Sequence, residues 1–310
     1  MLHDVIILGA GPAGLTAGLY ASRAGLKTAI IEKGQIGGQI SLTLNVENYP
    51  GVFGKEVTGP NLTEIMLEQA MSFGCEKITD EIISIEIKDK IKILKSKNVE
   101  YRAKSLIYAT GANPRKLGLE NEDKYTGKGI AYCATCDGAF YQGADIYVVG
   151  GGDAALEEAI FLTKFGKKVI VLNRSDKLRA TKIIQDRAFS NNKIEIRYNT
   201  EVKKINGGVF LESLELQNNK TGEKYVVTNE DGDPDIGLFI FVGYNPNTEL
   251  VKGLLELERG YVKASENTKT NIEGIFVAGD VRTKSIRQVV TATSDGAVAA
   301  IECEKYIESL

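Results

Sequence analysis

The sequence of 310 residues predicts an α/β protein with two Rossmann-like dinucleotide-binding domains of three-layer ββα type, the second inserted into the first. Three observations predict this fold. A glycine-rich turn joins an apolar run to a helical pattern near the start of the chain, the same pattern returns at Gly150, and later apolar runs again end at glycines. The length, which suits about two domains, agrees with this organisation.

The composition excludes several classes of function. Hydrophobic residues make up 43% of the chain, enough for sizeable cores, and a formal net charge of -3 gives no strong attraction to nucleic acid or an anionic membrane. A single histidine, His3, makes a Ser-His, Cys-His or multi-histidine metal site very hard to build. We find no signal peptide and no run of about 18 apolar residues, and therefore expect a cytoplasmic protein.

The first glycine pattern predicts a βαβ unit. An apolar run precedes Gly9, Gly11 and Gly14, and a helical pattern and a second apolar run, ending at Ile31, follow them. In such a unit the first glycine makes the tight turn, the second lets a pyrophosphate approach the backbone, and the third packs helix on strand. Glu32, at the end of the second run, is placed to hold a ribose hydroxyl.

The second pattern repeats the first. An apolar run leads into Gly150 and Gly152, Ala155 takes the place of the third glycine, and the sequence then predicts a helix over 156–165 and a strand over 168–172. Two dinucleotide-binding units in one chain argue for two dinucleotides, and hence for electrons that pass between them.

The residue that corresponds to Glu32 in the second unit is Asn173. The second unit thus lacks the acid that favours an unphosphorylated ribose, and it offers Arg174 and Arg179 nearby. Because an arginine at this place accommodates a 2'-phosphate, the pattern favours a phosphorylated dinucleotide. The alternative is that both arginines are ordinary solvated charges.

Three later junctions suggest where the chain crosses between domains. Apolar strands run into Gly111, Gly243 and Gly279, and Asp280 follows the last of these, where a carboxylate can reach the sugar chain of a cofactor. We therefore predict three segments, which are a first domain over 1–114, an inserted domain over 115–243 and the rest of the first domain over 244–310.

The cysteines predict redox chemistry. Two residues separate Cys133 from Cys136, a spacing that suits a reversible disulfide in a tight turn, and a zinc site would need further ligands that the sequence does not offer. Asp137 is the nearby candidate for handling a proton, or else a helix cap. We interpret the two other cysteines, Cys75 and Cys303, as packing or surface thiols.

The order of these motifs resembles the low-molecular-weight, bacterial-type thioredoxin reductases, which are FAD-dependent class II pyridine nucleotide-disulfide oxidoreductases. The resemblance covers essentially the whole chain. It rests on GxGPAG at 9–14, GGQ at 37–39, ENYPG at 47–51, ATG at 109–111, CATCD at 133–137, GGGDAALEEA at 150–159, AGD at 278–280 and RQV at 287–289. Its most specific element is CATCD just before the second glycine turn, because lipoamide-type relatives carry their cysteines in the FAD domain.

The resemblance implies a homodimer that passes electrons from NADPH through FAD to the Cys133/Cys136 disulfide and on to thioredoxin. It leaves open which cysteine faces the flavin. The residues implied for FAD are Gly9, Gly11, Pro12, Ala13, Gly14, Glu32, Lys33, Gly34, Gln35, Ile36, Gly37, Gly38, Gln39, Asn48, Ala109, Thr110, Gly111, Gly279, Asp280, Arg287, Gln288 and Val289. Those implied for the nicotinamide nucleotide are Gly150, Gly152, Asp153, Ala154, Ala155, Asn173, Arg174, Ser175 and Arg179.

The electron donor is where the sequence departs from the family. The family motif for the 2'-phosphate reads His-Arg-Arg-x-x-x-Arg, whereas this chain has Asn173, Arg174 and Ser175 before Arg179. Loss of a charge-assisted contact weakens the binding of NADPH by about 1.5 to 3 kcal/mol. We keep NADPH as the first choice.

Two other interpretations remain open. The same flavin and disulfide enzyme could take electrons from reduced ferredoxin or from NADH, or the chain could be a nucleotide-binding redox sensor without turnover. A ferredoxin-NADP reductase of similar fold lacks the cysteine pair, which argues against that assignment.

Overall fold

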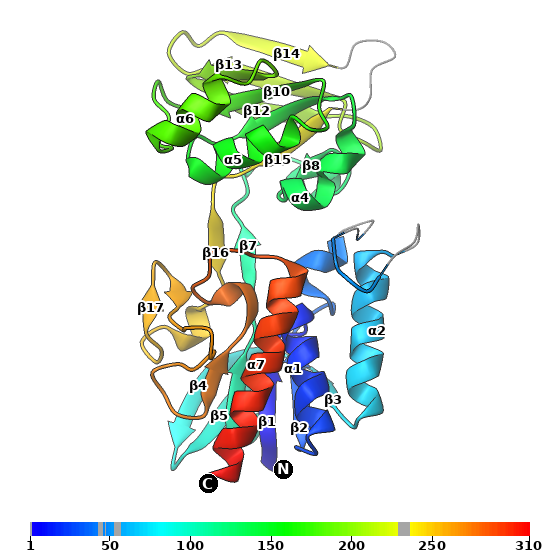
Figure 1. Cartoon of the computed structure of the whole chain (residues 1–310), viewed down its shortest axis with the longest axis vertical. Helices are drawn as coiled ribbons and strands as arrows, with labels where there is room; N and C mark the ends of the chain where they lie inside the picture. Colours follow the sequence, from blue (N-terminus) through cyan, green and yellow to red (C-terminus); the bar gives the residue numbers. More distant parts are fainter. Residues whose placement is uncertain (1, 43–45, 47, 53–56, 229–235) are drawn as a thin grey trace. The chain divides into compact units, whose positions relative to one another are not determined.

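The computed structural model describes residues 2–42, 46, 48–52, 57–228 and 236–310 (Figure 1). The chain divides into two compact units. Unit 1 is formed by Met1–Asn113 and Asn245–Leu310, and unit 2 by Pro114–Tyr244. Unit 2 is therefore an insertion into the sequence of unit 1.

Unit 1 is built on a mixed sheet in which the strands follow the order β3-β2-β1-β6-β5-β4, with β19 beside β6. The strands are β1 (Leu2–Leu8), β2 (Thr28–Glu32), β3 (Glu76–Thr79), β4 (Ile82–Lys88), β5 (Ile91–Ser96), β6 (Glu100–Tyr108) and β19 (Ile275–Val277). Strands β3, β2, β1, β6 and β19 pair in parallel, whereas β5 runs antiparallel to both β6 and β4. The central strands are continuous apolar runs because both faces of the sheet are covered, and Ile6, Ile7, Ile30 and Ile31 are fully buried.

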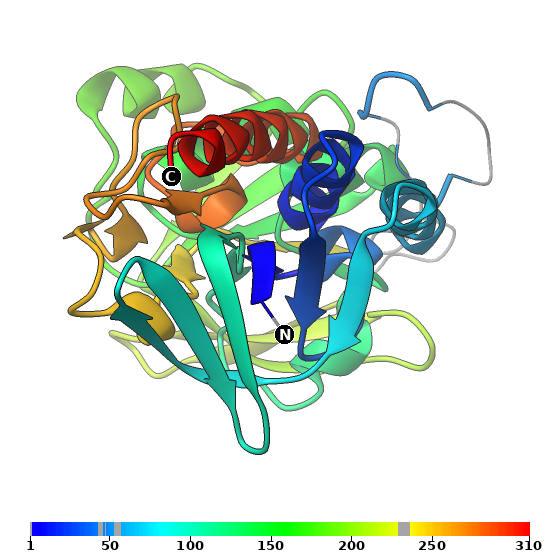
Figure 2. The same ribbon diagram turned by 90° about the horizontal axis from the view of Figure 1, so that it is seen from below.

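Three helices cover one face of this sheet, side by side in Figure 2. They are α1 (Pro12–Arg23), α2 (Gly59–Ser72) and α7 (Val289–Glu308). Pro12 suits the first helical position, where no backbone N–H is needed. A Cβ on Gly296 would lie 2.2 Å from the carbonyl oxygen of Ala13, so α1 and α7 touch backbone to backbone.

The opposite face of the sheet packs against the later part of the unit. Val251, Leu255 and Val262 are buried there with Ile6 and Leu106. The short elements of unit 1 are η1 (Gly38–Leu42), η3 (Glu249–Val251), β17 (Leu257–Glu258), β18 (Tyr261–Val262) and η4 (Gly279–Val281). Unit 1 thus has a sheet between two layers. The glycine turns follow the carboxyl ends of its parallel strands.

Unit 2 has a parallel sheet in the order β11-β10-β9-β15-β8 and a separate antiparallel meander. The parallel strands are β8 (Ile130–Ala131), β9 (Asp145–Val149), β10 (Lys168–Asn173), β11 (Ile194–Tyr198) and β15 (Gly237–Ile240). The meander consists of β12 (Thr200–Asn206), β13 (Ser213–Asn218) and β14 (Lys224–Thr228). The helices are α3 (Glu122–Tyr125), α4 (Ala134–Asp137), η2 (Gly138–Tyr141), α5 (Asp153–Leu162) and α6 (Lys182–Phe189).

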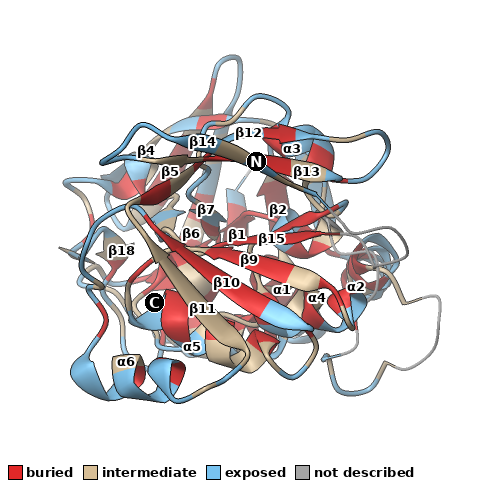
Figure 3. Cartoon of the chain, turned by 90° about the horizontal axis from the view of Figure 1, so that it is seen from above, coloured by how far each residue is buried: buried red, intermediate tan, exposed pale blue. Residues whose placement is uncertain are grey.

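The parallel sheet of unit 2 is the middle of three layers. Ala159 of α5 packs on Val171 and Phe239 at one face, and Leu216 of the meander packs with Leu172 at the other. Figure 3 shows β9 and β10 mostly as buried strands and the outer side of α6 as exposed. The layers explain the apolar runs that the sequence shows on both sides of the second glycine turn.

The chain passes between the units in β7 (Ala112–Pro114) and β16 (Tyr244–Pro246), which form a two-stranded sheet of their own. Within unit 1, the carbonyl oxygen of Gly111 accepts a hydrogen bond of 3.0 Å from the backbone N–H of Asn247. Within unit 2, the carbonyl oxygen of Gly243 accepts one of 2.9 Å from the N–H of Arg115. Each unit thus holds its own two chain ends side by side.

These layers confirm the predicted fold class of two Rossmann-like α/β domains, the second inserted into the first. The predicted helix at 156–165 begins and ends earlier, because Gly152 caps α5 and the chain turns after Leu162, which accepts bonds from the N–H groups of Phe165 and Gly166. Among the described residues, no helix is long and apolar enough to cross a membrane.

Candidate functional site

The first glycine turn has the geometry that its sequence predicts. Gly9 has a φ of +109°, and a Cβ there would lie 2.5 Å from the carbonyl oxygen of Ala109. A Cβ on Gly14 would lie 1.9 Å from the carbonyl oxygen of Gly9, so helix and strand pack too closely for any side chain. Among the described atoms, a Cβ on Gly11 would meet only Gly37 O, at 3.9 Å, and the space beside Gly11 is therefore open to a ligand.

Other predicted segments gather around this turn. The N–H of Gly37 donates to the carbonyl oxygen of Ala10 at 2.8 Å, and a Cβ on Gly38 would be 3.5 Å from Gly11 Cα. A Cβ on Gly279 would lie 2.9 Å from the Cβ of Ala13. With Ala109, which lies against Gly9, three further segments of the sequence therefore meet the turn where α1 begins.

Glu32 ends β2, and its carboxylate is used by the backbone. Oε2 accepts a hydrogen bond of 2.9 Å from the N–H of Ala10, and Oε1 accepts one of 3.1 Å from the N–H of Gly34. Glu32 thus connects the glycine turn to the loop after β2, and each oxygen keeps a lone pair for a ligand.

Asp280 and Arg287 carry polar atoms that lack partners in the described part of the chain. Oδ1 of Asp280 and Nε of Arg287 are both buried without a hydrogen bond. Burial raises the pKa of Asp280, although the nearby charges of Lys284 and Arg287 lower it. The Arg287 guanidinium lies 4.3 Å from the centre of the Tyr261 ring. Buried polar groups without partners mark a place where a ligand completes the structure.

The remaining residues predicted for this site lie in the same segments. Asn48 donates to Gln288 at 3.2 Å, Gln39 donates to Asn113 at 2.8 Å, and the Thr110 hydroxyl donates to Asn247 O at 2.8 Å. Lys33 and Gln35 are exposed, and Ile36 packs on the core. Gly111 lies between β6 and β7, and Val289 begins α7. Glu47, the first residue of the ENYPG motif, lies outside the described residues.

The second glycine turn repeats this geometry in unit 2. Gly150 has a φ of +149°, and a Cβ there would lie 2.6 Å from both Phe241 O and Ala155 Cβ. A Cβ on Gly152 would meet no described atom within 4 Å. Asp153 and Ala154 begin α5 beside this open space, so a phosphate group could approach the helix N-terminus there.

The loop after β10 folds back onto the second turn. The Asn173 amide is buried and donates to Ser175 O at 2.9 Å and Lys177 O at 3.1 Å, so it shapes the loop. The N–H of Arg179 donates to Gly151 O at 2.6 Å. The side chains of Arg174, Ser175 and Arg179 are exposed. The two cations, Arg174 and Arg179, therefore lie exposed in the loop beside the second glycine turn, while the Asn173 amide donates its hydrogen bonds within that loop.

Cys133 and Cys136 form a disulfide across the single turn of α4. Both residues are partly exposed, and the Cys133 carbonyl accepts a hydrogen bond of 3.1 Å from the N–H of Asp137. Burial raises the pKa of Asp137 to about 6. A disulfide within reach of solvent, beside a carboxyl group that keeps its proton up to about pH 6, is suited to thiol exchange.

Sequence reasoning missed two residues that hold the cysteine segment. Tyr132 and Glu122, joined by a hydrogen bond, lie just before the disulfide in unit 2, and the Tyr132 carbonyl accepts a bond of 3.0 Å from the hydroxyl of Tyr244. No motif marks them, because their pairing depends on the fold. Cys75 and Cys303 are buried free thiols, as packing residues would be.

Comparison with known proteins gives one consistent result. A family model described as pyridine nucleotide-disulphide oxidoreductase matches residues 3–296. A thioredoxin reductase from Peptoclostridium litorale is 50% identical over 100% of this chain and 98% of that protein, and one from Bacillus subtilis (strain 168) is 43% identical over 100% and 96%.

A solved structure agrees with the sequences. The thioredoxin reductase from Streptococcus pyogenes MGAS5005 superposes with a TM-score of 0.92 at 44% identity, covering 100% of this chain and 99% of that one. Both the sequence matches and the structural match extend over the whole length. The chain therefore belongs to the pyridine nucleotide-disulphide oxidoreductase family, among its thioredoxin reductases.

Proposed function

We propose that this enzyme is an FAD-dependent thioredoxin-disulfide reductase that passes electrons from NADPH through FAD to the Cys133–Cys136 disulfide and on to thioredoxin. The observation that carries the proposal is a partly exposed disulfide followed directly by a partly buried carboxyl group of raised pKa, in a chain with two glycine turns built for dinucleotides. Membership of the family implies a flavin cofactor and a nicotinamide substrate.

Unit 1 offers the groups that FAD needs. The open space at Gly11 suits a pyrophosphate, Glu32 suits a ribose, and the unpartnered Oδ1 of Asp280 suits a hydroxyl of the sugar chain. Bound there, a flavin supplies the two-electron chemistry that links a nicotinamide hydride to a disulfide. We therefore assign residues 1–114 and 244–310 to FAD binding, and 115–243 to the nicotinamide nucleotide and the redox disulfide.

Asp137 would manage the proton of the exchange with thioredoxin. One thiolate of the reduced Cys133/Cys136 pair attacks the disulfide of thioredoxin, a mixed disulfide forms, and a thiolate of thioredoxin departs. The second thiolate then releases thioredoxin as a dithiol and re-forms the Cys133–Cys136 bond. The two departing thiolates require two protons, and the Asp137 carboxyl group, with a pKa of about 6, can donate one of them.

Phe140 gives the partner an exposed apolar side chain close in sequence to the disulfide. Its side chain is 50% exposed, four residues after Cys136, and an apolar ring at this place would pack on the rim of the disulfide of thioredoxin. We propose that thioredoxin docks on this face of unit 2. A reduced dithiol at work also implies a reducing compartment, so we propose a cytoplasmic enzyme.

We propose a homodimer through unit 1. A groove of about 430 Å³ between α1, α2 and α7 is lined by Tyr20, Tyr49, Met66 and Val290 among others. Tyr20 and Val290 line the same groove and remain 39% and 42% exposed, and grouped exposed apolar side chains of this kind mark interaction surfaces. Sedimentation of Val290→Lys should show a monomer if this face forms the interface, whereas an unchanged dimer would place the interface elsewhere.

The proposed electron transfer is tested with serine variants of the disulfide. Cys133→Ser and Cys136→Ser should keep the yellow colour of bound flavin and lose thioredoxin reduction, while Cys75→Ala, a matched change at a buried free thiol, should keep both. Undiminished activity of either serine variant would refute the disulfide mechanism. Wild-type protein that binds flavin but turns over no thioredoxin would favour the redox sensor instead.

The donor needs its own experiment. Arg174 and Arg179 favour NADPH, whereas the degraded motif around Ser175 leaves NADH and reduced ferredoxin as alternatives. Each donor is added to the oxidised enzyme without oxygen while the flavin absorbance is followed. Bleaching by NADPH supports the proposal, and bleaching by ferredoxin with failure of both nicotinamides would replace the donor.

A further inference from the structure

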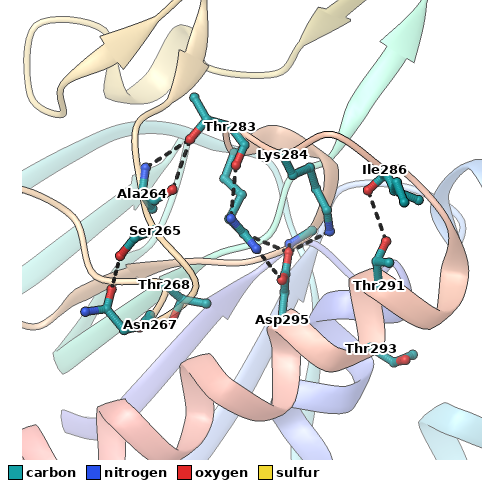
Figure 4. A network of polar contacts seen from close by, with 12 residues as sticks. Ala264, Ser265, Asn267, Thr268, Thr283, Lys284, Ile286, Thr291, Thr293 and Asp295 are labelled. Atoms are coloured by element: carbon teal, nitrogen blue, oxygen red, sulfur yellow. Dashed lines mark hydrogen bonds and ion pairs between the residues drawn. The ribbon is translucent and has the colours of Figure 1, made fainter.

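A buried cluster of charges is attached to the segment that carries Asp280. Asp295, on the second turn of α7, is 6% exposed, and its carboxylate accepts four hydrogen bonds. Oδ2 accepts from Gly279 N at 2.9 Å, from Arg282 Nε at 2.8 Å and from Lys284 Nζ at 2.8 Å. Oδ1 accepts from Arg282 Nη2 at 2.6 Å. Figure 4 shows these contacts converging on Asp295 from the loop before α7.

These bonds hold both ends of the segment that carries Asp280. Gly279 precedes Asp280 and has a φ of +80°, and Arg282 and Lys284 follow it. Thr283 adds a second attachment, because its hydroxyl donates to Ala264 O at 3.0 Å and its N–H donates to Val262 O at 2.9 Å (Figure 4). The backbone on either side of Asp280 is thus fixed from α7 and from the loop after β18.

The cluster also has an uneven charge. The side chains of Arg282 and Lys284 are only 10% and 7% exposed, and Asp295 alone neutralises one of these two buried cations. Buried charges require counter-charges. Asp280 is the other carboxylate in range, since Lys284 and Arg287 both stabilise its charged form, whereas burial and Asp295 oppose it. An ionised Asp280 therefore supplies the second negative charge beside these cations.

We propose that Lys284, held in place by Asp295, is a positioning residue of the flavin site, which keeps Asp280 fixed and anionic as a hydrogen-bond acceptor for a hydroxyl of the flavin sugar chain. This inference rests on the proposed flavin site in unit 1. In this role, Lys284 and Asp295 contact neither the reacting atoms nor the disulfide. A carboxylate accepts such a bond more strongly than a carboxylic acid does.

The proposal predicts how flavin binding depends on pH. Without Lys284, the pKa of Asp280 rises, because burial and Asp295 both oppose its charge and only Arg287 still supports it. Asp280 then takes up a proton at a higher pH, and flavin should be released at a higher pH than from the wild-type protein. Removal of one nearby charge shifts such a midpoint by about one pH unit or more.

The experiment measures flavin retention rather than activity. Purified holoprotein is dialysed at a series of pH values, and the bound flavin is determined from its absorbance. Lys284→Met should move the midpoint of release upward by about one unit, and Lys284→Arg, which keeps the charge, should restore the wild-type midpoint. Lys305→Met, at an exposed lysine of α7, is the matched control and should leave the midpoint unchanged.

Two further variants secure the test. Lys284→Gln keeps a donor for Asp295 without a charge, so it carries the test if Lys284→Met fails to fold, and it should show the same upward shift. Asp280→Asn should bind flavin more weakly at every pH, and adding Lys284→Met to it should produce no additional shift. Circular dichroism of each variant verifies that it is folded.

The outcomes separate the two levels of the argument. A yellow wild-type protein with unshifted Lys284→Met and Lys284→Gln variants would overturn this inference and leave the proposed function intact. Undiminished flavin affinity of Asp280→Asn would do the same. A wild-type protein that takes up no FAD would overturn the proposed function and this inference together.

Discussion

The phenol of Tyr132 donates a hydrogen bond of 2.8 Å to Oε1 of Glu122, directly before the first cysteine of the disulfide. Glu122 is 3% exposed, and it also accepts bonds from the N–H groups of three residues, Leu117, Gly118 and Leu119. Burial and the neighbouring Glu122 raise the pKa of Tyr132, so the phenol stays a donor. This pair fixes the segment that leads into Cys133.

Tyr132→Phe should therefore lower both stability and exchange rate. The loss of one hydrogen bond to a buried carboxylate costs about 1.5 kcal/mol, seen as a lower melting temperature, and a less constrained Cys133 should reduce thioredoxin more slowly. Tyr101→Phe breaks a bond of similar length, 2.7 Å, to the partly exposed Asp80 in unit 1, and should affect stability only. Equal rates for the two variants would contradict a positioning role for Tyr132.

Asp137 should make the exchange step slow down as the pH rises through about 6. Because burial raises its pKa to about 6, the protonated form that donates to a departing thiolate is lost as the pH rises through about 6. The rate at which the pre-reduced enzyme reduces thioredoxin, measured in a single turnover, should show this inflection, and Asp137→Asn should abolish it. The sequence contains one histidine, His3, buried in β1 of unit 1, so an inflection that survives in Asp137→Asn would need another source.

The two free thiols should be inert in the folded protein. Burial raises the pKa of Cys75 to about 11 and that of Cys303 to about 12, and only the thiolate reacts readily. Iodoacetamide followed by mass spectrometry should label neither of them in the native oxidised enzyme, and Cys133 and Cys136 alone after reduction. Labelling of Cys303 before unfolding would show that α7 opens far more easily than its burial implies.

Lys92 should make stability increase at alkaline pH. Its ammonium group is buried in β5 and donates to Lys90 O, Lys104 O and the hydroxyl of Tyr306, and burial lowers its pKa to about 8. The unfolded chain then binds more protons than the folded one between about pH 8 and 10, so the free energy of unfolding rises with pH across this range.

Urea unfolding of wild type and Lys92→Met at several pH values checks this. The rise above pH 8 should disappear in Lys92→Met and persist in Lys95→Met, at an exposed lysine of the same strand. Parallel curves for wild type and Lys92→Met would mean that Lys92 keeps its ordinary pKa.

Ser175→Arg should strengthen the binding of NADPH. Ser175 is exposed beside Arg174, and its hydroxyl donates to Lys177 O, so it offers a 2'-phosphate no charge. A charge-assisted contact there should lower the KM for NADPH roughly ten- to a hundredfold, which corresponds to about 1.5 to 3 kcal/mol. The KM for NADH serves as the control and should not move. If the KM for NADPH stays the same, the departure from the family motif does not limit donor binding.

Local chemistry explains what could be predicted from the sequence. The tight contacts of Gly9 and Gly14 and the open space at Gly11 follow from spacing, because each glycine has one structural purpose within a short segment. The end of α5 at Leu162 was harder to place, since the apolar pattern continues to Phe165, which turns back onto Leu162 instead of extending the helix.

The charge networks could not be predicted in the same way. Asp295 reads in the sequence as an ordinary polar residue of an amphipathic helix, and Glu122 as a surface acid. Their partners depend on how loops fold back onto helices, which no periodicity records. The loop after β10 is a similar case, because the hydrogen bonds from the Asn173 amide to Ser175 O and Lys177 O depend on how that loop folds back.

The hydrogen bonds at the two crossings have a consequence for how such a chain could evolve. Gly111 and Asn247 close unit 1, and Arg115 and Gly243 close unit 2, so the bonds that secure each pair of ends belong to one unit alone. A gene segment that encodes residues 114–244 is therefore a cassette with matched ends. Recombination could exchange this segment between relatives without breaking the hydrogen bond that joins the two chain ends in either unit.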